Sequence, residues 1–420
     1  MGERLTLDLT AMAHGGAALG RHEGKVIFVP YGLPDERVVV EVTDDRGRHA
    51  YARLLEVVRP SSDRVSPPCP HFGPDGCGGC QWQHAAYPAQ LRYKAQVVAD
   101  QLTRLGRLTD PLVRPPLPDP SGWAYRNQAR FRPVPGGGLG FYSGESHHVT
   151  PVTACPILHP LLADLYAALE VDLPGLRALT LRAAVASGEQ MLIFETEGDD
   201  PPALELDLPV SCVLLRADGT TLTLVGQDHL NETVAGRTYR ISAPSFFQVN
   251  TAQAERLVQQ VMAYLDLRGG ETVLDGYCGV GLFTLPLAER AGLVYAVEVE
   301  PQAVEDLLAN TEGLDNVEVV EGPTAALLEA LEEPLDAAVV DPPRTGLEPE
   351  ALDGLLVAAP RRLVYVSCDP ATLARDGRRL AEAGYRLVEA QPLDMFPQTC
   401  HVETVSLWEA GGKVRKVASR

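Results

Sequence analysis

Apolar and polar residues alternate along the first 60 positions of the chain. The segment KVIFVPYGLPDERVVVEVTDD contains two short apolar runs separated by Gly32-Leu33-Pro34-Asp35, a turn signal, and RHAYARLLEVVRPS adds a third run. Short strands joined by turns that contain Gly and Pro, within so few residues, are typical of a small barrel of the OB type. We therefore predict a β-barrel over residues 1–58.

The middle of the chain changes from helical to strand periodicity. A linker over 60–68 and a Cys-rich segment come before a helical pattern that runs from about Tyr87 to Leu105. Residues 115–122 are rich in Pro and irregular. From about 123 to 243 the pattern is mostly that of strands, so we predict a mainly β central domain over 59–243.

After residue 250 the apolar positions follow a third arrangement. AQAERLVQQVMAYLDL is typical of an amphipathic helix, and six strand-like runs then alternate with helical segments. These runs are TVLDGYCG (272–279), LVYAVEVE (293–300), VEVVEG (317–322), DAAVVDPP (336–343), RLVYVSCD (362–369) and YRLVEAQPLD (385–394). The alternation predicts a doubly wound, Rossmann-like α/β domain over 244–420. Such sheets bind ligands beyond the carboxyl ends of their strands, where Asp275, Glu298, Asp341 and Cys368 fall.

Composition and charge limit the function classes. No run of 18 apolar residues occurs and MGERLTLDLT lacks a secretory pattern, so we expect a cytoplasmic protein without a membrane partner, whose eight cysteines stay reduced. The net charge of −20 lies entirely in the second part, because residues 1–170 hold 17 basic and 17 acidic side chains. Eight basic and three acidic residues between 85 and 135 favour a phosphate-binding patch, although a solvated face explains them equally well.

The stretch VLDGYCGVGLFTL is typical of a strand, a glycine-rich turn and the start of a helix. A dinucleotide fingerprint needs a third glycine where this chain has Thr284. Asp275 before the turn suits an ammonium group or hydroxyls, and Glu298 after the next strand suits ribose hydroxyls. The combination favours S-adenosylmethionine over NAD. The alternative is that both acids only cap helices or lie on the surface.

A thiol and a carboxylate form the second candidate feature. Cys368 ends an apolar run just before a helix expected near Ala371, whose N-terminus would favour the thiolate. Glu403 has apolar neighbours, and burial there would raise its pKa towards the working range of a base. This pair suits methylation of uracil carbon 5, which needs a nucleophile at carbon 6 and a base for the carbon 5 proton. Cys400 and His401 are the alternative nucleophile and base.

Two further motifs refine the chemistry. DPPRTG has Arg344 where enzymes that methylate amines place an aromatic residue, which counts against an amine target. CPHFGPDGCGGCQWQH carries three cysteines with the spacing C-x7-C-x2-C, and a fourth lies in ACPILHP; they are Cys69, Cys77, Cys80 and Cys155. Four thiolates indicate zinc or an iron–sulfur cluster. A redox Cys-x-x-Cys is the alternative, but no thioredoxin-like pattern surrounds it.

The motifs SFFQVN, DGYCGVGLF, DPPRTGL, SCDPATLARD and HVETVSLW together resemble, in this order, those of the RNA uracil-C5-methyltransferase family, which makes 5-methyluridine. The resemblance implies that Cys368 is the nucleophile and Glu403 the general base. It also implies S-adenosylmethionine-binding positions at Gln248, Tyr277, Glu298 and Asp341. One departure is Gly276, where the family often has Leu, and we expect the glycine to loosen the turn slightly.

The first part of the chain carries resemblances of its own. Residues 1–58 resemble a TRAM domain, an RNA-binding module, and the four cysteines resemble the [4Fe–4S] site of the 23S rRNA branch, with a first interval of seven residues in place of five. Zinc remains the alternative metal. We expect a monomer that acts on a flipped uracil in single-stranded or loop RNA, with 23S rRNA as substrate and tRNA as the alternative. The alternative from another functional class is an RNA-binding protein without catalytic activity.

The segments YRNQARF and GFY resemble the RNA-contacting surface of that family's central domain. Arg126, Arg130 and Arg132 are expected to hold phosphates. Phe131 or Phe141 is expected to stack on a base, unless these rings belong to the core of a sheet.

Overall fold

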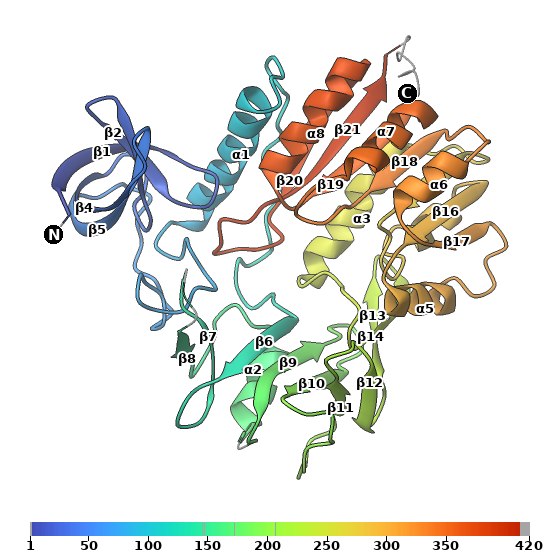
Figure 1. The fold of residues 1–420 in the computed structure, drawn as a ribbon, viewed down its shortest axis with the longest axis horizontal. Helices are drawn as coiled ribbons and strands as arrows, with labels where there is room; N and C mark the ends of the chain where they lie inside the picture. Colours follow the sequence, from blue (N-terminus) through green and yellow to red (C-terminus); the bar gives the residue numbers. More distant parts are fainter. Residues whose placement is uncertain (1, 145, 147, 172, 206, 412–420) are drawn as a thin grey trace.

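The N-terminal strands close into the expected barrel (Figure 1). The computed structural model describes residues 2–144, 146, 148–171, 173–205 and 207–411. The barrel has the order β1-β2-β3-β5-β4 and is made of β1 (Arg4–Met12), β2 (Ala18–His22), β3 (Lys25–Val29), β4 (Arg37–Asp45) and β5 (His49–Arg59). Leu5, Leu7 and Leu9, two residues apart on β1, are all buried, as the alternating pattern predicts.

A second sheet has seven strands in the order β12-β11-β10-β9-β6-β7-β8. Its strands are β6 (Gln128–Pro133), β7 (Leu139–Tyr142), β8 (Val149–Pro151), β9 (Leu176–Ala183), β10 (Gln190–Thr196), β11 (Ser211–Leu215) and β12 (Thr221–Val225). Helix α2 (Pro160–Ala168) covers one face of it, where Leu162 packs with Phe131 and Leu179. A hairpin of β13 (His229–Val234) and β14 (Arg237–Ser242) leads to the next unit.

The third sheet confirms the doubly wound prediction and has the order β17-β16-β15-β18-β19-β21-β20. Its strands are β15 (Thr272–Gly276), β16 (Leu293–Glu298), β17 (Val317–Glu321), β18 (Ala337–Val340), β19 (Arg362–Ser367), β20 (Tyr385–Leu393) and β21 (Glu403–Ala410). Strand β21 runs antiparallel to both its neighbours, while β15 to β19 run parallel to one another. The beginning of β21 therefore lies at the same edge as the carboxyl ends of the parallel strands.

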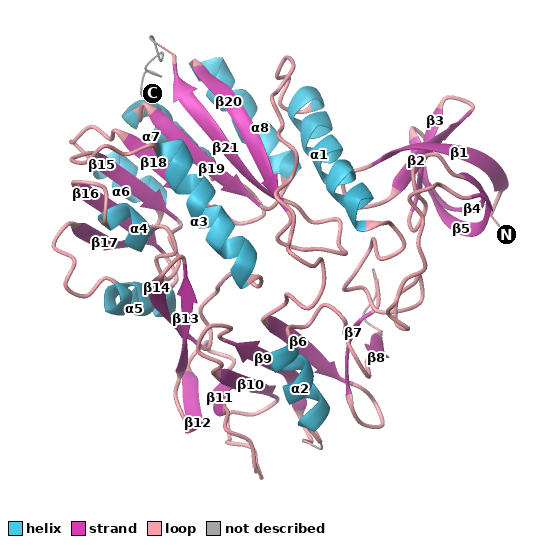
Figure 2. Cartoon of the chain, turned by 180° about the vertical axis from the view of Figure 1, so that it is seen from behind, coloured by secondary structure: helices cyan, strands magenta, loops and turns pink. Residues whose placement is uncertain are grey.

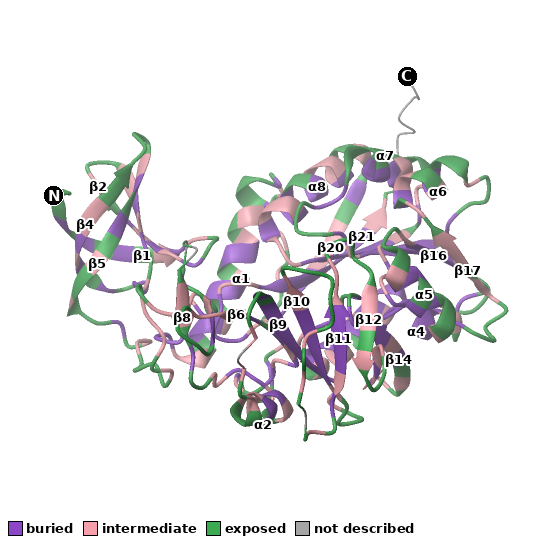
Figure 3. Ribbon diagram, turned by 60° about the horizontal axis from the view of Figure 1, so that its bottom comes forward, coloured by how far each residue is buried: buried purple, intermediate pink, exposed green. Residues whose placement is uncertain are grey.

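Helices cover both faces of this sheet (Figure 2). On one face lie α3 (Thr251–Leu265) and α4 (Thr284–Ala288), with α5 (Pro301–Asn310) beside them. On the other lie α6 (Thr324–Ala330), α7 (Pro349–Ala358) and α8 (Pro370–Ala383). The inner strands β15, β16, β18 and β19 are mostly buried, which explains why their sequences are continuous apolar runs, whereas the edge strand β17 is only partly buried (Figure 3).

Helix α1 (Tyr87–Arg104) lies in the sequence range of the expected central domain but packs on the third sheet. Its Val98 and Leu102 are buried in one hydrophobic cluster with Leu373 of α8 and Tyr365 of β19. The irregular segment after it continues along the sheet edge, because Val113 and Leu117 pair in parallel with residues of β20. Within the described residues, no helix combines the length and the apolar character that a bilayer crossing demands.

Candidate active site

The thiol and the carboxylate singled out from the sequence meet at one edge of the third sheet. The antiparallel register of β19 and β21 pairs Ser367 with Thr404. The next facing positions beyond that pair are Cys368 and Glu403. Asp341 follows β18, the neighbouring strand, and its charge acts on both groups. The fold thus brings together three residues that are 27 to 62 positions apart in the chain.

Burial sets the electrostatics of this edge. Glu403 is 4% exposed, and desolvation together with the charge of Asp341 raises its pKa well above the ordinary value, against the opposing effect of Arg344. Desolvation raises the pKa of Asp341 as well. One oxygen of Glu403, Oε1, is buried and has no hydrogen-bond partner among the described residues. The expectation that burial raises the pKa of Glu403 is confirmed.

The position of Cys368 before a helix suggested a lowered pKa for its thiol, but the structure indicates the opposite. Burial, and then the charges of Glu403 and Asp341, raise its pKa to about 12. The helix N-terminus does not offset these effects, because Oδ1 of Asp369 already accepts hydrogen bonds from the backbone N–H groups of Ala371 and Thr372 at 2.8 and 3.0 Å. The helix thus carries its own negative charge at its N-terminus, and the neighbouring thiol is neutral in the free protein.

The glycine-rich turn after β15 holds a buried acid with one oxygen free for a ligand. Oδ2 of Asp275 accepts a hydrogen bond from Oγ1 of Thr284 at 2.6 Å, while Oδ1 is buried without a partner in the described part of the chain. Desolvation raises the pKa of Asp275 to about 7. A side chain on Gly279, in the turn that follows, would meet open space. These features fit the ammonium group of S-adenosylmethionine.

Glu298, at the end of β16, fixes the shape of the same turn. Its Oε2 accepts a hydrogen bond from the N–H of Gly279 at 2.8 Å, and Oε1 accepts from Val299 and Glu300. Tyr277 adopts a φ of 62° and donates its hydroxyl to Glu348. A carboxylate held by backbone amides keeps its remaining lone pairs available for hydroxyl groups.

Two further residues singled out from the sequence, Gly276 and Gln248, are both buried. A Cβ on Gly276 would lie 3.2 Å from side-chain carbons of Thr324 and Val340, so the glycine permits close packing here, and the looser turn stays a prediction. Gln248 is buried in the loop between β14 and α3, where its backbone oxygen accepts a hydrogen bond from Asn127. No hydrogen bond joins its side chain to Asp275 or Cys368 among the contacts of the described residues.

The alternative nucleophile and base lie in the loop before β21. Burial and the charges of Arg344 and Lys94 lower the pKa of His401 to about 4, and its ring meets that of Phe396 edge-on. Cys400 is partly buried and lies against Gly16 of the barrel. A histidine with so low a pKa is a weaker proton acceptor than a carboxylate whose pKa is raised.

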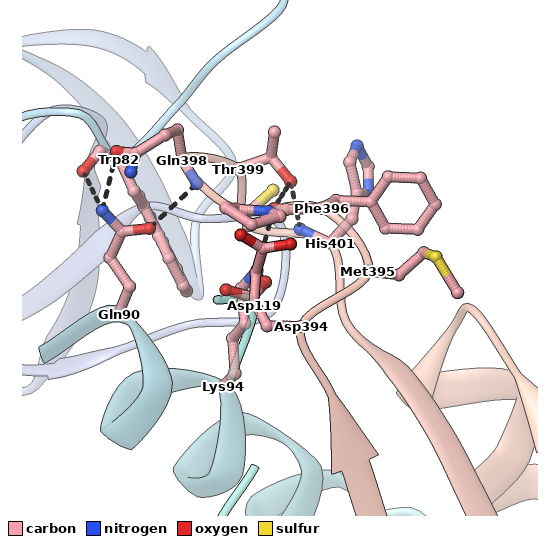
Figure 4. Close-up of polar contacts among 12 residues, drawn as sticks. Trp82, Gln90, Lys94, Asp119, Asp394, Met395, Phe396, Gln398, Thr399 and His401 are labelled. Carbon is pink, nitrogen blue, oxygen red and sulfur yellow. Dashed lines mark hydrogen bonds and ion pairs between the residues drawn. The ribbon is translucent and has the colours of Figure 1, made fainter. Parts of the chain in front are cut away.

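Helix α1 anchors the loop that leads to Glu403 (Figure 4), a feature that the sequence did not indicate. Nζ of Lys94 donates to Oδ1 of Asp394 at 2.5 Å. The side chains of Gln90 and Gln398 are joined at 2.9 Å, and the N–H of Gln398 donates to Oε1 of Gln90 at 3.0 Å. The partners are about 300 residues apart in the chain, so no local pattern could have revealed them.

The four cysteines of the expected cluster come together although Cys155 is distant in sequence. Cys69, Cys77, Cys80 and Cys155 all line one cavity of about 280 Å³. Burial, and then the neighbouring thiols, raise the pKa of Cys80 to about 12. Within the described residues, however, no group of three or more His, Cys, Asp or Glu side chains is arranged to hold a metal ion.

The proposed RNA-contacting residues of the central sheet divide into two groups. Phe131 is fully buried and stacks on Phe141 at 4.5 Å and on Tyr166 at 4.6 Å, so the expectation that it stacks on a base is wrong. Its ring belongs to the core because β6 points it toward α2. Arg126 and Arg130, in contrast, line the cavity of the four cysteines.

The order of the third sheet, the antiparallel strand β21 and the acids at the carboxyl ends of β15 and β16 define the class of S-adenosylmethionine-dependent methyltransferases. A family model described as tRNA (uracil-5-)-methyltransferase matches residues 204–410, and one described as TRAM domain matches residues 1–55. The chain belongs to this family of RNA methyltransferases. The family resemblance, the TRAM barrel and the methyl donor expected from the sequence are thereby confirmed.

Full-length relatives support this membership. An uncharacterized RNA methyltransferase of Thermosynechococcus vestitus is 37% identical, covering 97% of this chain and 98% of its own. One of Streptomyces avermitilis is 38% identical, covering 98% and 100%. The crystal structure of a Pyrococcus abyssi tRNA (uracil-54, C5)-methyltransferase with S-adenosyl-L-homocysteine superposes with a TM-score of 0.75 and 27% identity, over 96% of this chain and all of that one.

Proposed function

We propose that this enzyme methylates carbon 5 of a uridine in RNA, with Cys368 as the nucleophile and Glu403 as the general base. The observation that supports the proposal is the register of β19 and β21, which brings Cys368 and Glu403 to the same edge of the sheet as Asp275. Arg344 after Asp341 supports a carbon target, because an amine target calls for an aromatic residue there.

The chemistry follows from these groups. The thiol of Cys368 gives up its proton to solvent and its sulfur bonds to carbon 6 of the uracil. The electrons of the double bond between carbons 5 and 6 shift towards the carbon 4 oxygen, which makes carbon 5 nucleophilic. S-adenosylmethionine, when bound, supplies the methyl group that carbon 5 accepts. Glu403 then takes the proton from carbon 5, the carbon–sulfur bond breaks, and the ring double bond returns. A raised pKa suits Glu403 to this task, since a stronger base accepts the proton more readily.

We assign the binding of S-adenosylmethionine to Gln248, Tyr277, Glu298 and Asp341, and we add Asp275. The unpartnered oxygen of Asp275 is positioned for the ammonium group, and Glu298 for the ribose hydroxyls.

The test uses RNA that carries 5-fluorouridine, whose fluorine cannot leave as a proton would. Wild-type protein should form a covalent adduct with it that survives denaturing electrophoresis, and Cys368→Ala should form none. Cys212→Ala, a buried cysteine of the central sheet, is the matched control and should form the adduct. An adduct with Cys368→Ala would refute the assignment, as would methylation of a nucleotide other than uridine.

For the RNA substrate we propose 23S rRNA, with tRNA as the second candidate. The barrel and the cysteines first suggested rRNA. The structure of a tRNA methyltransferase, which superposes over 96% of this chain, favours tRNA to a similar degree. Mapping of 5-methyluridine in both RNAs from cells with and without the gene separates them.

We propose that the four cysteines hold a [4Fe–4S] cluster and not zinc. Four thiols that line one cavity support a site that they share, and the resemblance of their segment to the 23S rRNA branch favours the cluster over zinc. Its role would be structural, because methyl transfer moves no electrons. Iron and sulfide analysis of anaerobically purified protein, with Cys80→Ser beside Cys212→Ser, tests this.

We further propose three units, 1–58, 59–243 and 244–420, in a monomer that works in the cytoplasm. The three sheets support the division, and eight free cysteines support a reducing compartment. Light scattering of the purified protein tests the monomer.

A further inference from the structure

The loop between β1 and β2 of the barrel extends to the loop that leads to Glu403. The carbonyl oxygen of Gly16 accepts a hydrogen bond at 2.9 Å from the indole of Trp82, which is buried. A Cβ on Gly16, whose φ is +90°, would lie 2.7 Å from Cβ of Cys400. The contact therefore depends on glycine, since any side chain at this position would push the barrel loop away.

His14, two residues earlier in the same loop, contacts the turn that carries Cys368. Its Nε2 lies 3.4 Å from Oδ2 of Asp369. The other oxygen of Asp369 holds the first N–H groups of α8. One carboxylate thus joins the RNA-binding barrel, the turn after β19 and the start of a helix.

The electrostatics of the two side chains favour an ion pair between them. The hydrogen bond with Asp369 raises the pKa of His14. Burial alone would raise the pKa of Asp369, but His14 and the backbone N–H groups lower it to about 2. Two further groups act on this side. The charge of Arg375 on α8 interacts with Asp369, and His401 is neutral near pH 7 because its pKa is about 4.

We propose that the barrel loop 13–17 forms a wall of the methyl-transfer site and that His14 is a positioning residue, which acts on Cys368 through Asp369. This inference rests on the proposed function, because it assumes that Cys368 is the nucleophile. The sulfur of Cys368 has to meet carbon 6 within a narrow range of positions, and its turn lies between β19 and the capped start of α8. A barrel that binds RNA and also holds this turn links the position of the RNA to that of the thiol.

The test measures the single-turnover rate of adduct formation with 5-fluorouridine RNA, and separately the affinity for that RNA. His14→Gln removes the charge and keeps a side chain of similar reach. Asp369→Asn removes the same pair but retains a residue that caps helices well. We expect each variant to lower the rate roughly fivefold to tenfold at pH 6.5, as loss of one charged contact does. The double variant should be no slower than either single one, and affinity should change less than twofold.

The pH dependence of the rate distinguishes a positioning role of charged His14 from a contact that only stabilises the fold. His14 is charged below its raised pKa, so the ratio of wild-type rate to His14→Gln rate should be largest at pH 6 and should approach one by pH 9. His22→Gln, on β2 of the same barrel, should match wild type throughout.

A rate for His14→Gln within twofold of wild type at pH 6.5 would overturn the inference, as would additive losses or a ratio independent of pH. Those results would leave the proposed function intact if Cys368→Ala still formed no adduct. An adduct with Cys368→Ala would instead refute the proposed function and this inference together.

Discussion

Lys94 and Asp394 form an ion pair whose side chains are both fully buried, with 2.5 Å between Nζ and Oδ1. Lys94 also donates to the backbone oxygen of Phe396 at 3.0 Å. The pair joins α1 to the first residue after β20, nine positions before Glu403. The arrangement of the loop that precedes the proposed base therefore depends on a helix from the first quarter of the chain.

Removal of one partner of this pair should be costly. Lys94→Met leaves the carboxylate of Asp394 buried without its cation, so we expect the free energy of unfolding to fall by about 3–5 kcal/mol. Urea denaturation measures the change. Arg378→Ala, which breaks an exposed pair with Glu382 on α8, is the control and should cost about 0.5 kcal/mol or less. A loss for Lys94→Met as small as that of the control would contradict the role of the pair.

Glu403→Gln should separate the two halves of the reaction. The amide cannot accept the carbon 5 proton, but the methyl group can still be transferred once Cys368 has added. We expect ordinary, unfluorinated RNA to accumulate as a methylated covalent adduct on a denaturing gel, with turnover reduced by about 10²-fold or more. Glu409→Gln, at the far end of β21, should turn over normally. Normal turnover by Glu403→Gln would show that another group is the base.

Alkylation of Cys368 in the free protein should be slow and should rise steeply with pH. Since the pKa of the thiol is about 12, its thiolate increases about tenfold for each pH unit between 7 and 9. Asp341→Asn removes a negative charge that raises this pKa, so it should speed alkylation at a given pH. Mass spectrometry of the Cys368 peptide after timed iodoacetamide treatment follows the rate. Asp353→Asn, at a partly exposed pair on α7, should have no effect.

Because of Asp275, both the stability of the free protein and its affinity for S-adenosylmethionine should depend on pH. Its pKa of about 7 exceeds the ordinary value of about 3.9, so the folded state binds the extra proton and stability falls as pH rises from about 4 to 7. Asp275→Asn should therefore raise the melting temperature of the free protein at pH 8. It should also weaken S-adenosylmethionine binding at least tenfold, as measured by calorimetry, because the amide lacks the charge.

A melting temperature for Asp275→Asn below that of wild type at pH 8 would contradict the burial argument. In wild type, S-adenosylmethionine affinity should fall as pH drops below 7, because protonation of Asp275 removes the partner of the ammonium group. Glu271→Gln, at the start of β15 and near the opposite edge of the sheet, is the control for both measurements.

The periodicity of apolar residues was sufficient to predict the strands after residue 270 and the α/β class of that domain. Each of the six runs after residue 270 became a strand of the third sheet. The four inner ones, β15, β16, β18 and β19, are the most continuously apolar because helices cover both of their faces. The strand-end positions of Asp275, Glu298 and Cys368 followed from the same runs. Glu403 was found because a carboxylate among apolar residues stands out against its local sequence.

The sequence by itself determined the strands, their turns and the motif residues, since these depend on neighbours a few positions away. Only the tertiary structure decided which distant groups meet: Lys94 with Asp394, His14 with Asp369, and Phe131 with the core of its sheet. It also decided the pKa of Cys368, where the local pattern suggested the opposite direction. Ionisation depends on burial and on charges brought close by packing, and neither is encoded within a short stretch of chain.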